Sequence, residues 1–166
     1  MENHNNEKLK NRIKELLNYM GFEPEVYERM EEGRVVFNIK TRDAQLLIGK
    51  QGSTLESLQH IVRILSRQDG VDERYPFALD IDDYKDKRVI YLKELARKAA
   101  HQVRDTKRAV SLAPMPAYER RIIHNYLSLY SDIKSESMGK DPNRKIIIRY
   151  KQQAKGNGDF NFIENM

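Results

Sequence analysis

Two glycines separated by two polar residues form the part of this sequence best suited to hold a phosphate: Gly49-Lys50-Gln51-Gly52, called here the glycine segment. Glycine permits a positive φ and, lacking a Cβ atom, lets another backbone approach closely. A helix expected to start at Ser53 would direct its first N–H groups and its positive dipole end toward the segment. Lys50 adds a mobile charge. A sugar-phosphate grip is one interpretation, and a helix C-cap followed by a turn is the other.

An arginine and a histidine four residues apart, Arg120 and His124, are the second candidate for holding phosphate. Residues at this spacing project from one face of a helix, and we expect that face to be exposed because it lies opposite Ile122 and Tyr126. The guanidinium offers several donors and the imidazole at least one. Arg121 is the nearest further cation. An ordinary solvated helix face is the alternative interpretation, because this spacing is common.

No arrangement of residues indicates an enzyme or a bound metal. Cysteine is absent, which excludes thiolate ligands, disulfides and a cysteine nucleophile. The histidines at positions 4, 60, 101 and 124 lack the paired spacing of metal ligands. Asp80, Asp82 and Asp83 could bind Mg²⁺, but such a cluster more often ends a strand and caps the next helix. We therefore expect no metal, no cofactor and no catalysis.

Hydrophobic periodicity predicts the elements that position the glycine segment. A helix is expected from Glu7 to Met20, ended by Gly21. Ser53 and Glu56 have the spacing of a capping box at the start of a later helix. The full order is helix, strand, strand, helix, glycine segment, helix and strand, which is an α+β arrangement. The strands of this region are expected within 22–30, an extended stretch broken by Pro24, and at 34–40 and 77–81, and the short helix at 43–48.

The elements around the Arg120–His124 pair predict a second α+β unit. A long helix is expected from Tyr84 to Thr106, with a basic ridge beside its apolar stripe. The residues of that ridge are Lys93, Arg97, Arg104 and Arg108. Pro116 suits the first position of the helix that carries the pair. Short strands are expected at 109–112, 132–138 and 145–150.

Charge is unevenly distributed along the 166 residues. The formal net charge is +5, but residues 1–82 carry −3 and residues 83–166 carry +8. A basic half favours a polyanionic partner, although a solvated basic surface explains the numbers equally well. No apolar run is long enough for a membrane span, and the polar first residues lack a signal core, which favours a cytoplasmic protein.

Two strings carry resemblances to known domains. Leu47-Ile48-Gly49-Lys50-Gln51-Gly52, in the element order given above, resembles the prokaryotic type II KH domain over about residues 8–82. That resemblance implies a three-stranded sheet with helices on one face and a groove for about four unpaired nucleotides. The residues it implies as RNA contacts are Gly49, Lys50, Gln51, Gly52 and Ser53.

The second string is Ala113-Pro114-Met115-Pro116-Ala117-Tyr118-Glu119-Arg120-Arg121-Ile122-Ile123-His124, which is similar to the R-three-H domain. This resemblance covers about residues 84–150. It implies that Arg120, His124 and Arg121 bind single-stranded nucleic acid, supported by the basic ridge.

A KH domain followed directly by an R-three-H domain resembles the bacterial Jag family, also called KhpB or SpoIIIJ-associated. We therefore expect a KH domain at 8–82 and an R-three-H domain at 83–151, between a disordered tail at 1–7 and a flexible tail at 152–166. Many family members carry a further domain before KH, which we expect to be absent here.

The expected function is single-stranded RNA binding in the cytoplasm without catalysis. The family resemblance implies a post-transcriptional role in bacterial cell division or cell shape. It also implies heterodimer formation with a small KH-only partner. A protein-interaction adaptor and a single-stranded DNA-binding protein are the alternatives that the residues leave open.

Overall fold

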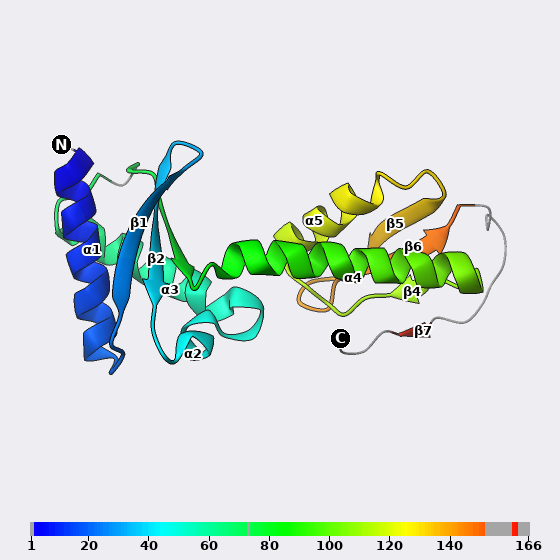
Figure 1. Ribbon diagram of the computed structural model, residues 1–166, viewed down its shortest axis with the longest axis horizontal. Coiled ribbons are helices and arrows are strands. Elements are labelled where there is room, and N and C mark those ends of the chain that lie inside the picture. Colours follow the sequence, from blue (N-terminus) through cyan, green and yellow to red (C-terminus); the bar gives the residue numbers. More distant parts are fainter. Residues whose placement is uncertain (1, 73, 152–160, 163–166) are drawn as a thin grey trace. The chain divides into compact units, whose positions relative to one another are not determined.

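The chain divides into two units, residues 1–85 and 86–166, and the first is built on a three-stranded sheet (Figure 1). This computed structural model describes residues 2–72, 74–151 and 161–162. The elements of the first unit are α1 (Glu2–Tyr19), β1 (Glu25–Glu31), β2 (Arg34–Lys40), α2 (Ala44–Ile48), the 3-10 turn η1 (Lys50–Gly52), α3 (Ser53–Gln68) and β3 (Phe77–Ile81). The sheet order is β1-β2-β3, with β1 antiparallel and β3 parallel to β2.

A single hydrophobic core lies between this sheet and its helices. Alternate side chains of β2 and β3, such as Phe37 and Leu79, point into it and are fully buried. Helices α1 and α3 contribute apolar residues at helical spacing, such as Leu9 and Val62. The mixed α+β class is confirmed, and the core holds the two ends of the glycine segment in place through α2 and α3.

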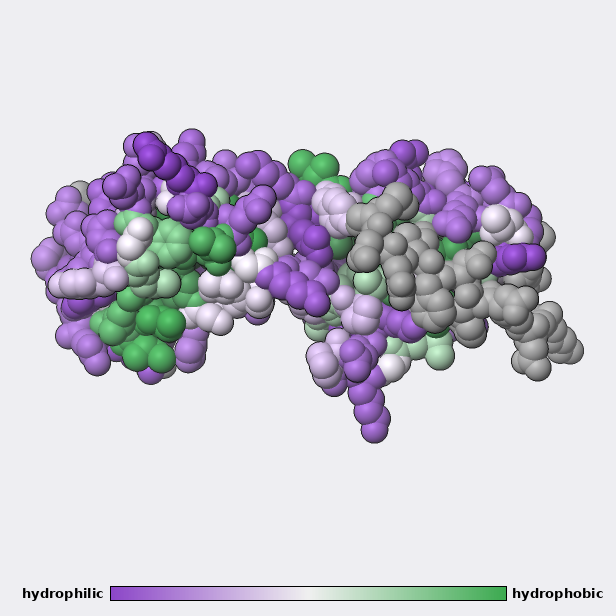
Figure 2. Space-filling model, turned by 90° about the horizontal axis from the view of Figure 1, so that it is seen from below, coloured by the Kyte–Doolittle hydropathy of each residue, from purple (hydrophilic) through white to green (hydrophobic). Residues whose placement is uncertain are grey.

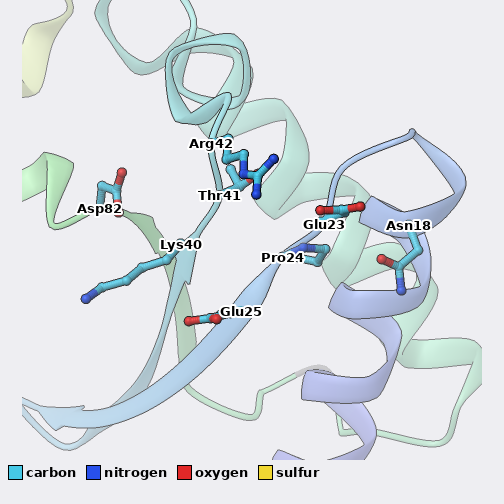
Figure 3. A pocket seen from close by; sticks show the side chains of 8 residues that line it. All are labelled: Asn18, Glu23, Pro24, Glu25, Lys40, Thr41, Arg42 and Asp82. Atoms are coloured by element: carbon cyan, nitrogen blue, oxygen red, sulfur yellow. The ribbon is translucent and has the colours of Figure 1, made fainter.

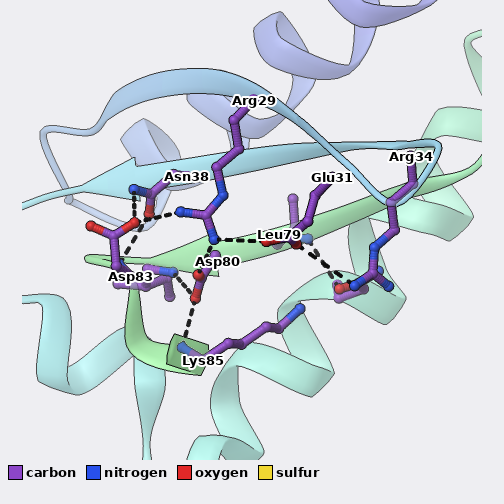
Figure 4. A network of polar contacts seen from close by, with 10 residues as sticks. Arg29, Glu31, Arg34, Asn38, Leu79, Asp80, Asp83 and Lys85 are labelled. Atoms are coloured by element: carbon purple, nitrogen blue, oxygen red, sulfur yellow. Dashed lines mark hydrogen bonds and ion pairs between the residues drawn. The ribbon is translucent and has the colours of Figure 1, made fainter. Parts of the chain in front are cut away.

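Polar side chains gather on the opposite face of the same sheet (Figure 4). Arg29 donates to Asp83 at 2.6 Å and to Asp80 at 3.2 Å. The buried Asp80 also accepts from the backbone N–H of Ile81 at 2.9 Å and of Lys85 at 3.2 Å. Burial raises the pKa of Asp80 against these hydrogen bonds, which lower it. For Asp80, the prediction that the aspartate cluster caps the following helix is confirmed.

The second unit combines two helices with a four-stranded sheet. Its elements are α4 (Tyr84–Thr106), whose first two residues belong to the first unit, β4 (Val110–Ser111), α5 (Ala117–Leu127), β5 (Ile133–Met138), β6 (Lys145–Tyr150) and β7 (Asn161–Phe162). The order is β5-β6-β4-β7, with β6 antiparallel to both neighbours and β7 parallel to β4. A second core, which shares no residue with the first, includes Leu92, Ile123 and Ile148.

Both ends of the chain differ from the prediction. Helix α1 begins at Glu2, so residues 2–7 are helical, and the expected disordered tail was wrong. The hydroxyl of Tyr75 donates to Asn6 at 2.6 Å and ties this first turn to the unit. At the other end, Asn161–Phe162 pair with β4, within the segment expected to be flexible. Residues 152–160 and 163–166 lie outside the described residues.

Two predictions about helix capping are corrected, although α3 begins at the expected Ser53. Ser53 is the first residue of α3, with Gly52 at the N-cap and no side-chain cap, so the expected capping box with Glu56 does not form. The left-handed Gly52 closes the 3-10 turn and thereby takes the capping position. Pro116 is the N-cap of α5, one position before the expected one. Among the described residues, no helix has both the length and the hydropathy needed to cross a bilayer.

Candidate nucleic-acid interface

The glycine segment makes a tight left-handed turn between α2 and α3. Gly49, Gln51 and Gly52 have φ values of 69°, 52° and 83°. A Cβ atom on Gly49 would lie 2.0 Å from the hydroxyl oxygen of Thr54, and one on Gly52 would lie 3.0 Å from the ring of Tyr84. Both glycines are therefore required by the packing of the turn as well as by its backbone conformation.

Exposure within the glycine segment is uneven. Lys50 and the neighbouring Ser53 are exposed, and Gln51 is half-buried. Gly52 is buried against Tyr84, so it belongs to the packed side of the turn. The surface offered to a ligand is therefore Lys50 and the first turn of α3, whose N-cap has no side chain to block it.

The outer edge of β3 is occupied by two side chains of α3 that sequence reasoning missed. The Gln59 amide donates to the carbonyl of Phe77 at 3.2 Å and accepts from the N–H of Leu79 at 3.1 Å. Arg63 donates to the same Phe77 carbonyl at 3.3 Å. Their four-residue spacing indicates that the two side chains share one face of α3. It does not indicate that this face meets the edge of β3. The two side chains satisfy an edge strand that would otherwise be open to pairing.

A hollow of about 600 Å³ lies on the first unit, apart from the glycine segment (Figure 3). Its lining mixes both signs of charge, because it includes Lys40 and Arg42 as well as Glu23, Glu25 and Asp82. None of the sequence-predicted site residues lines it. The remaining lining residues are Asn18, Pro24 and Thr41. The mixture of charges makes this hollow a poor match for a polyanion.

Arg120 does not lie on an exposed face, so that part of the prediction was wrong. Its side chain is buried and donates to the carbonyl of Met115 at 2.7 Å and to the Asp141 carboxylate at 3.0 Å. The pair projects from one side of α5, as its spacing predicted. However, that side packs against the loops before α5 and after β5, so Arg120 joins two segments of its own unit.

His124 is held between two serines of β5. Its Nδ1 and Nε2 atoms lie 2.8 Å from the hydroxyls of Ser135 and Ser137 respectively. Burial lowers the pKa of His124 below its ordinary value of 6.5, and the charge of Arg120 lowers it further. A neutral imidazole donates through one nitrogen and accepts through the other, so the two serines take opposite roles. The alternation of Ser135 and Ser137 on one strand face was the signal that could have found them.

The predicted basic ridge is only partly available to an anion. Arg97 makes two hydrogen bonds to Glu94, at 2.8 and 2.7 Å. Arg104 makes two to Asp132, at 2.7 and 2.8 Å, which lower the pKa of Asp132 to about 2. Lys93 is exposed, as is Arg121 on α5. Among the described residues, no cluster of three histidine or carboxylate side chains is placed to hold a metal ion.

Comparison with known proteins finds one matching domain and several similar proteins. The model of the R-three-H domain matches residues 91–150. RNA-binding protein KhpB of Clostridium symbiosum is 40% identical over 116 residues, which cover 70% of this chain and 52% of that protein. RNA-binding protein KhpB of Bacillus subtilis is 40% identical over 121 residues, covering 71% and 57% respectively. This chain is similar to both KhpB proteins over about 70% of its own length. It spans about half the length of these KhpB relatives.

The R-three-H match contains one of the two candidate sites. Arg120, Arg121 and His124 lie within the matched residues, together with the serines that hold the imidazole. The glycine segment lies outside them. The similarity to the KhpB relatives covers more residues than the R-three-H domain has, so it is not confined to that domain.

Proposed function

We propose that this chain binds single-stranded RNA without catalysing a reaction, and that its first unit is a type II KH domain. The observation that carries the proposal is the glycine segment, where Lys50 is exposed in front of the start of α3. A left-handed turn, an exposed lysine and a helix N-terminus together suit a sugar-phosphate backbone. The name of the KhpB relatives, RNA-binding proteins, supports the same function.

In this proposal the R-three-H domain makes a second contact from α5. Arg121 reaches phosphate directly because its side chain is exposed. Arg120 holds the two segments beside α5 in place and does not contact phosphate, since it is buried and hydrogen-bonded within the unit. A phosphate that binds His124 has to replace the hydroxyl of Ser135 or Ser137. Binding weakens as salt rises, because phosphate contacts release counterions.

The test is titration of a fluorescently labelled, unstructured RNA against wild type and the variant Lys50→Asp/Gln51→Asp. Charge reversal in the glycine segment should raise the dissociation constant about tenfold or more. The matched control is Asn11→Asp/Lys14→Asp on α1, which makes the same change in net charge away from the segment. An unchanged dissociation constant for Lys50→Asp/Gln51→Asp would rule out RNA binding by the glycine segment. Equal losses of affinity in both variants would show that only the net charge matters.

The type of nucleic acid is decided by competition. RNA and DNA of the same sequence should displace the labelled RNA with different efficiency, because the 2′-hydroxyl distinguishes them at a specific site. Displacement by DNA at equal or lower concentration would favour the single-stranded DNA-binding alternative.

A partner protein is the second part of the proposal, and exposed apolar side chains on α3 favour it. Ile61 and Ile64 are three residues apart, so they share a helix face, and both are nearly half exposed. Hydrophobic residues gather on the surface of the first unit among hydrophilic ones (Figure 2). We propose that this face pairs with a small KH-only protein.

Light scattering of the mixed proteins tests the pairing. Ile61→Asp/Ile64→Asp should abolish the heterodimer, because it would bury two uncompensated carboxylates. Ile90→Asp, at an exposed isoleucine of the second unit, is the control and should leave the heterodimer intact. A heterodimer that survives the double variant would exclude this face.

A cytoplasmic role in cell division or cell shape rests on the family resemblance alone. Replacing the chromosomal copy with the Lys50→Asp/Gln51→Asp variant tests it. Cell length and width should then change as they do in a deletion strain. Wild-type cell dimensions in the deletion strain would exclude the role.

A further inference from the structure

Two half-exposed tyrosines of the second unit are connected by one ion pair. Tyr91 on α4 is 39% exposed and Tyr118 on α5 is 42% exposed. The Arg88 guanidinium lies 5.1 Å from the centre of the Tyr91 ring. The hydroxyl of Tyr118 donates to a carboxylate oxygen of Glu119 at 3.3 Å. Neither tyrosine was singled out by the sequence, because neither belongs to the Arg120–His124 spacing.

The ion pair that connects these rings is rigid. Arg88 makes two hydrogen bonds to Glu119, at 2.7 and 3.0 Å, and the Glu119 side chain is fully buried. A two-pronged arginine–carboxylate pair fixes the orientation of both groups. It therefore ties the beginning of α4 to the first turn of α5. Rings held in this way lose little conformational entropy when a ligand covers them.

The chemistry of the patch favours the bases of a nucleic acid. Exposed tyrosines offer flat π-faces on which bases of any sequence can stack. Arg121 follows Tyr118 by three residues on α5, so it lies on the same side of the helix and is exposed. The half of the chain that contains the patch carries a net charge of +8. A polyanion is thereby attracted to the place where its bases would stack.

We propose that Tyr91 and Tyr118 form a stacking platform for bases of single-stranded RNA, preorganised by the Arg88–Glu119 ion pair. This inference rests on the proposed function and adds a base-binding surface to the R-three-H domain. The platform is separate from the Arg120–His124 pair, whose side chains are bonded within the unit. Phosphate held by Arg121 would leave the attached base beside the Tyr118 ring.

Comparison of two probes tests the platform. A labelled oligoadenylate and an abasic oligomer of the same length carry the same phosphates, so only the first can stack. The dissociation constant of the abasic oligomer divided by that of oligoadenylate should fall about tenfold in Tyr91→Leu/Tyr118→Leu. Tyr91→Phe/Tyr118→Phe retains the rings and should keep the wild-type ratio. Tyr19→Leu, at an 83% exposed tyrosine of the first unit, is the matched control and should also keep it.

The outcomes separate the platform from the proposed function. One outcome is that wild type binds oligoadenylate, while the leucine variant melts at the wild-type temperature and keeps the wild-type ratio. This outcome overturns the platform but leaves RNA binding intact. Equal weakening for both probes overturns it as well, because the rings then act without stacking. A leucine variant that changes only self-association, measured by light scattering, assigns the patch to a protein contact. No binding by wild type refutes the proposed function itself.

Discussion

Arg120 and His124 show how the partners of a side chain decide its role. Both lie on one side of α5, but Arg120 joins two segments of its own unit and the imidazole is held by two hydroxyls. The exposed Arg121 between them has the freedom that the spacing pattern suggested for the pair. At the scale of single residues, the candidate interface therefore consists of the exposed Arg121 and of Arg120 and His124, which are bonded within the unit.

The lowered pKa of His124 makes the stability of the protein depend on pH. Because the folded state holds the imidazole neutral, the unfolded chain binds a proton more readily below pH 6.5. The free energy of unfolding should therefore fall as the pH drops through 6.5 toward the lowered pKa. Urea unfolding at pH 7.5 and 5.5 should show a smaller difference in His124→Gln than in wild type. His101→Gln, at an exposed histidine of α4, should keep the wild-type difference, and loss of the difference in that control would contradict the assignment.

The Arg88–Glu119 pair should contribute more to stability than the Arg97–Glu94 pair. Removing Arg88 leaves the fully buried Glu119 carboxylate without its cation, which costs about 3–5 kcal/mol for a buried pair. The Arg97–Glu94 pair is exposed, and such pairs contribute about 0–1 kcal/mol. Urea unfolding of Arg88→Met and Arg97→Met measures the two costs with the same substitution. Equal costs would show that burial of Glu119 does not matter.

At the scale of elements, the turn between α2 and α3 depends on both backbone and packing. Its left-handed residues reverse the chain within the glycine segment, and Thr54 and Tyr84 close over the two glycines. The same α3 places Gln59 and Arg63 against the edge of β3. One helix therefore begins at the candidate grip and also shields the edge of the sheet.

Gly49→Ala should destabilise the protein more than Gly21→Ala. Both glycines have a positive φ, and the left-handed conformation alone costs an alanine about 1–2 kcal/mol. Nothing lies within 4 Å of a Cβ atom on Gly21, whereas one on Gly49 would lie 2.0 Å from the Thr54 hydroxyl. Thermal unfolding compares the stabilities, and RNA titration should show a loss for Gly49→Ala only. Similar melting temperatures would mean that the turn can move away from Thr54.

At the scale of the molecule, each unit has a core of its own. Most buried residues of the first core come from α1, α3 and the three-stranded sheet, and most of those in the second come from α4, α5 and the four-stranded sheet. The candidate contacts follow this division, with the glycine segment in one unit and the R-three-H residues in the other. RNA binding through both units would combine two weak contacts on one strand.

Core substitutions should therefore act on one unit at a time. Phe37→Ala should cost about 3–5 kcal/mol in the first core and Ile123→Ala about 2–5 kcal/mol in the second. Hydrogen exchange should quicken in residues 2–72 for Phe37→Ala and in residues 110–150 for Ile123→Ala. Faster exchange throughout the chain for either variant would show that the two units unfold together.

Local structure was determined by the sequence to a large extent. The helix of 84–106 has the bounds that its periodicity predicted, the strands of 34–40 and 77–81 lie where alternation placed them, and the strand of 145–150 lies where it was expected. The glycine segment was recognisable because left-handed turns need glycine. These features depend on neighbours in the sequence, so the sequence is sufficient to find them. The helical start at Glu2 was missed because its support, Tyr75, is distant in the sequence.

Only the tertiary structure decided which side chains are available to a ligand. Spacing shows that Arg120 and His124 share a helix face, but not that Asp141 and two serines of β5 meet that face. Arg104 and Arg88 likewise find their carboxylates 28 and 31 residues away. Periodicity specifies the direction of a side chain relative to its own helix, whereas burial and charge pairing depend on what folds against it. Tyr91 and Tyr118 were therefore visible as a pair only once α4 and α5 had been brought together.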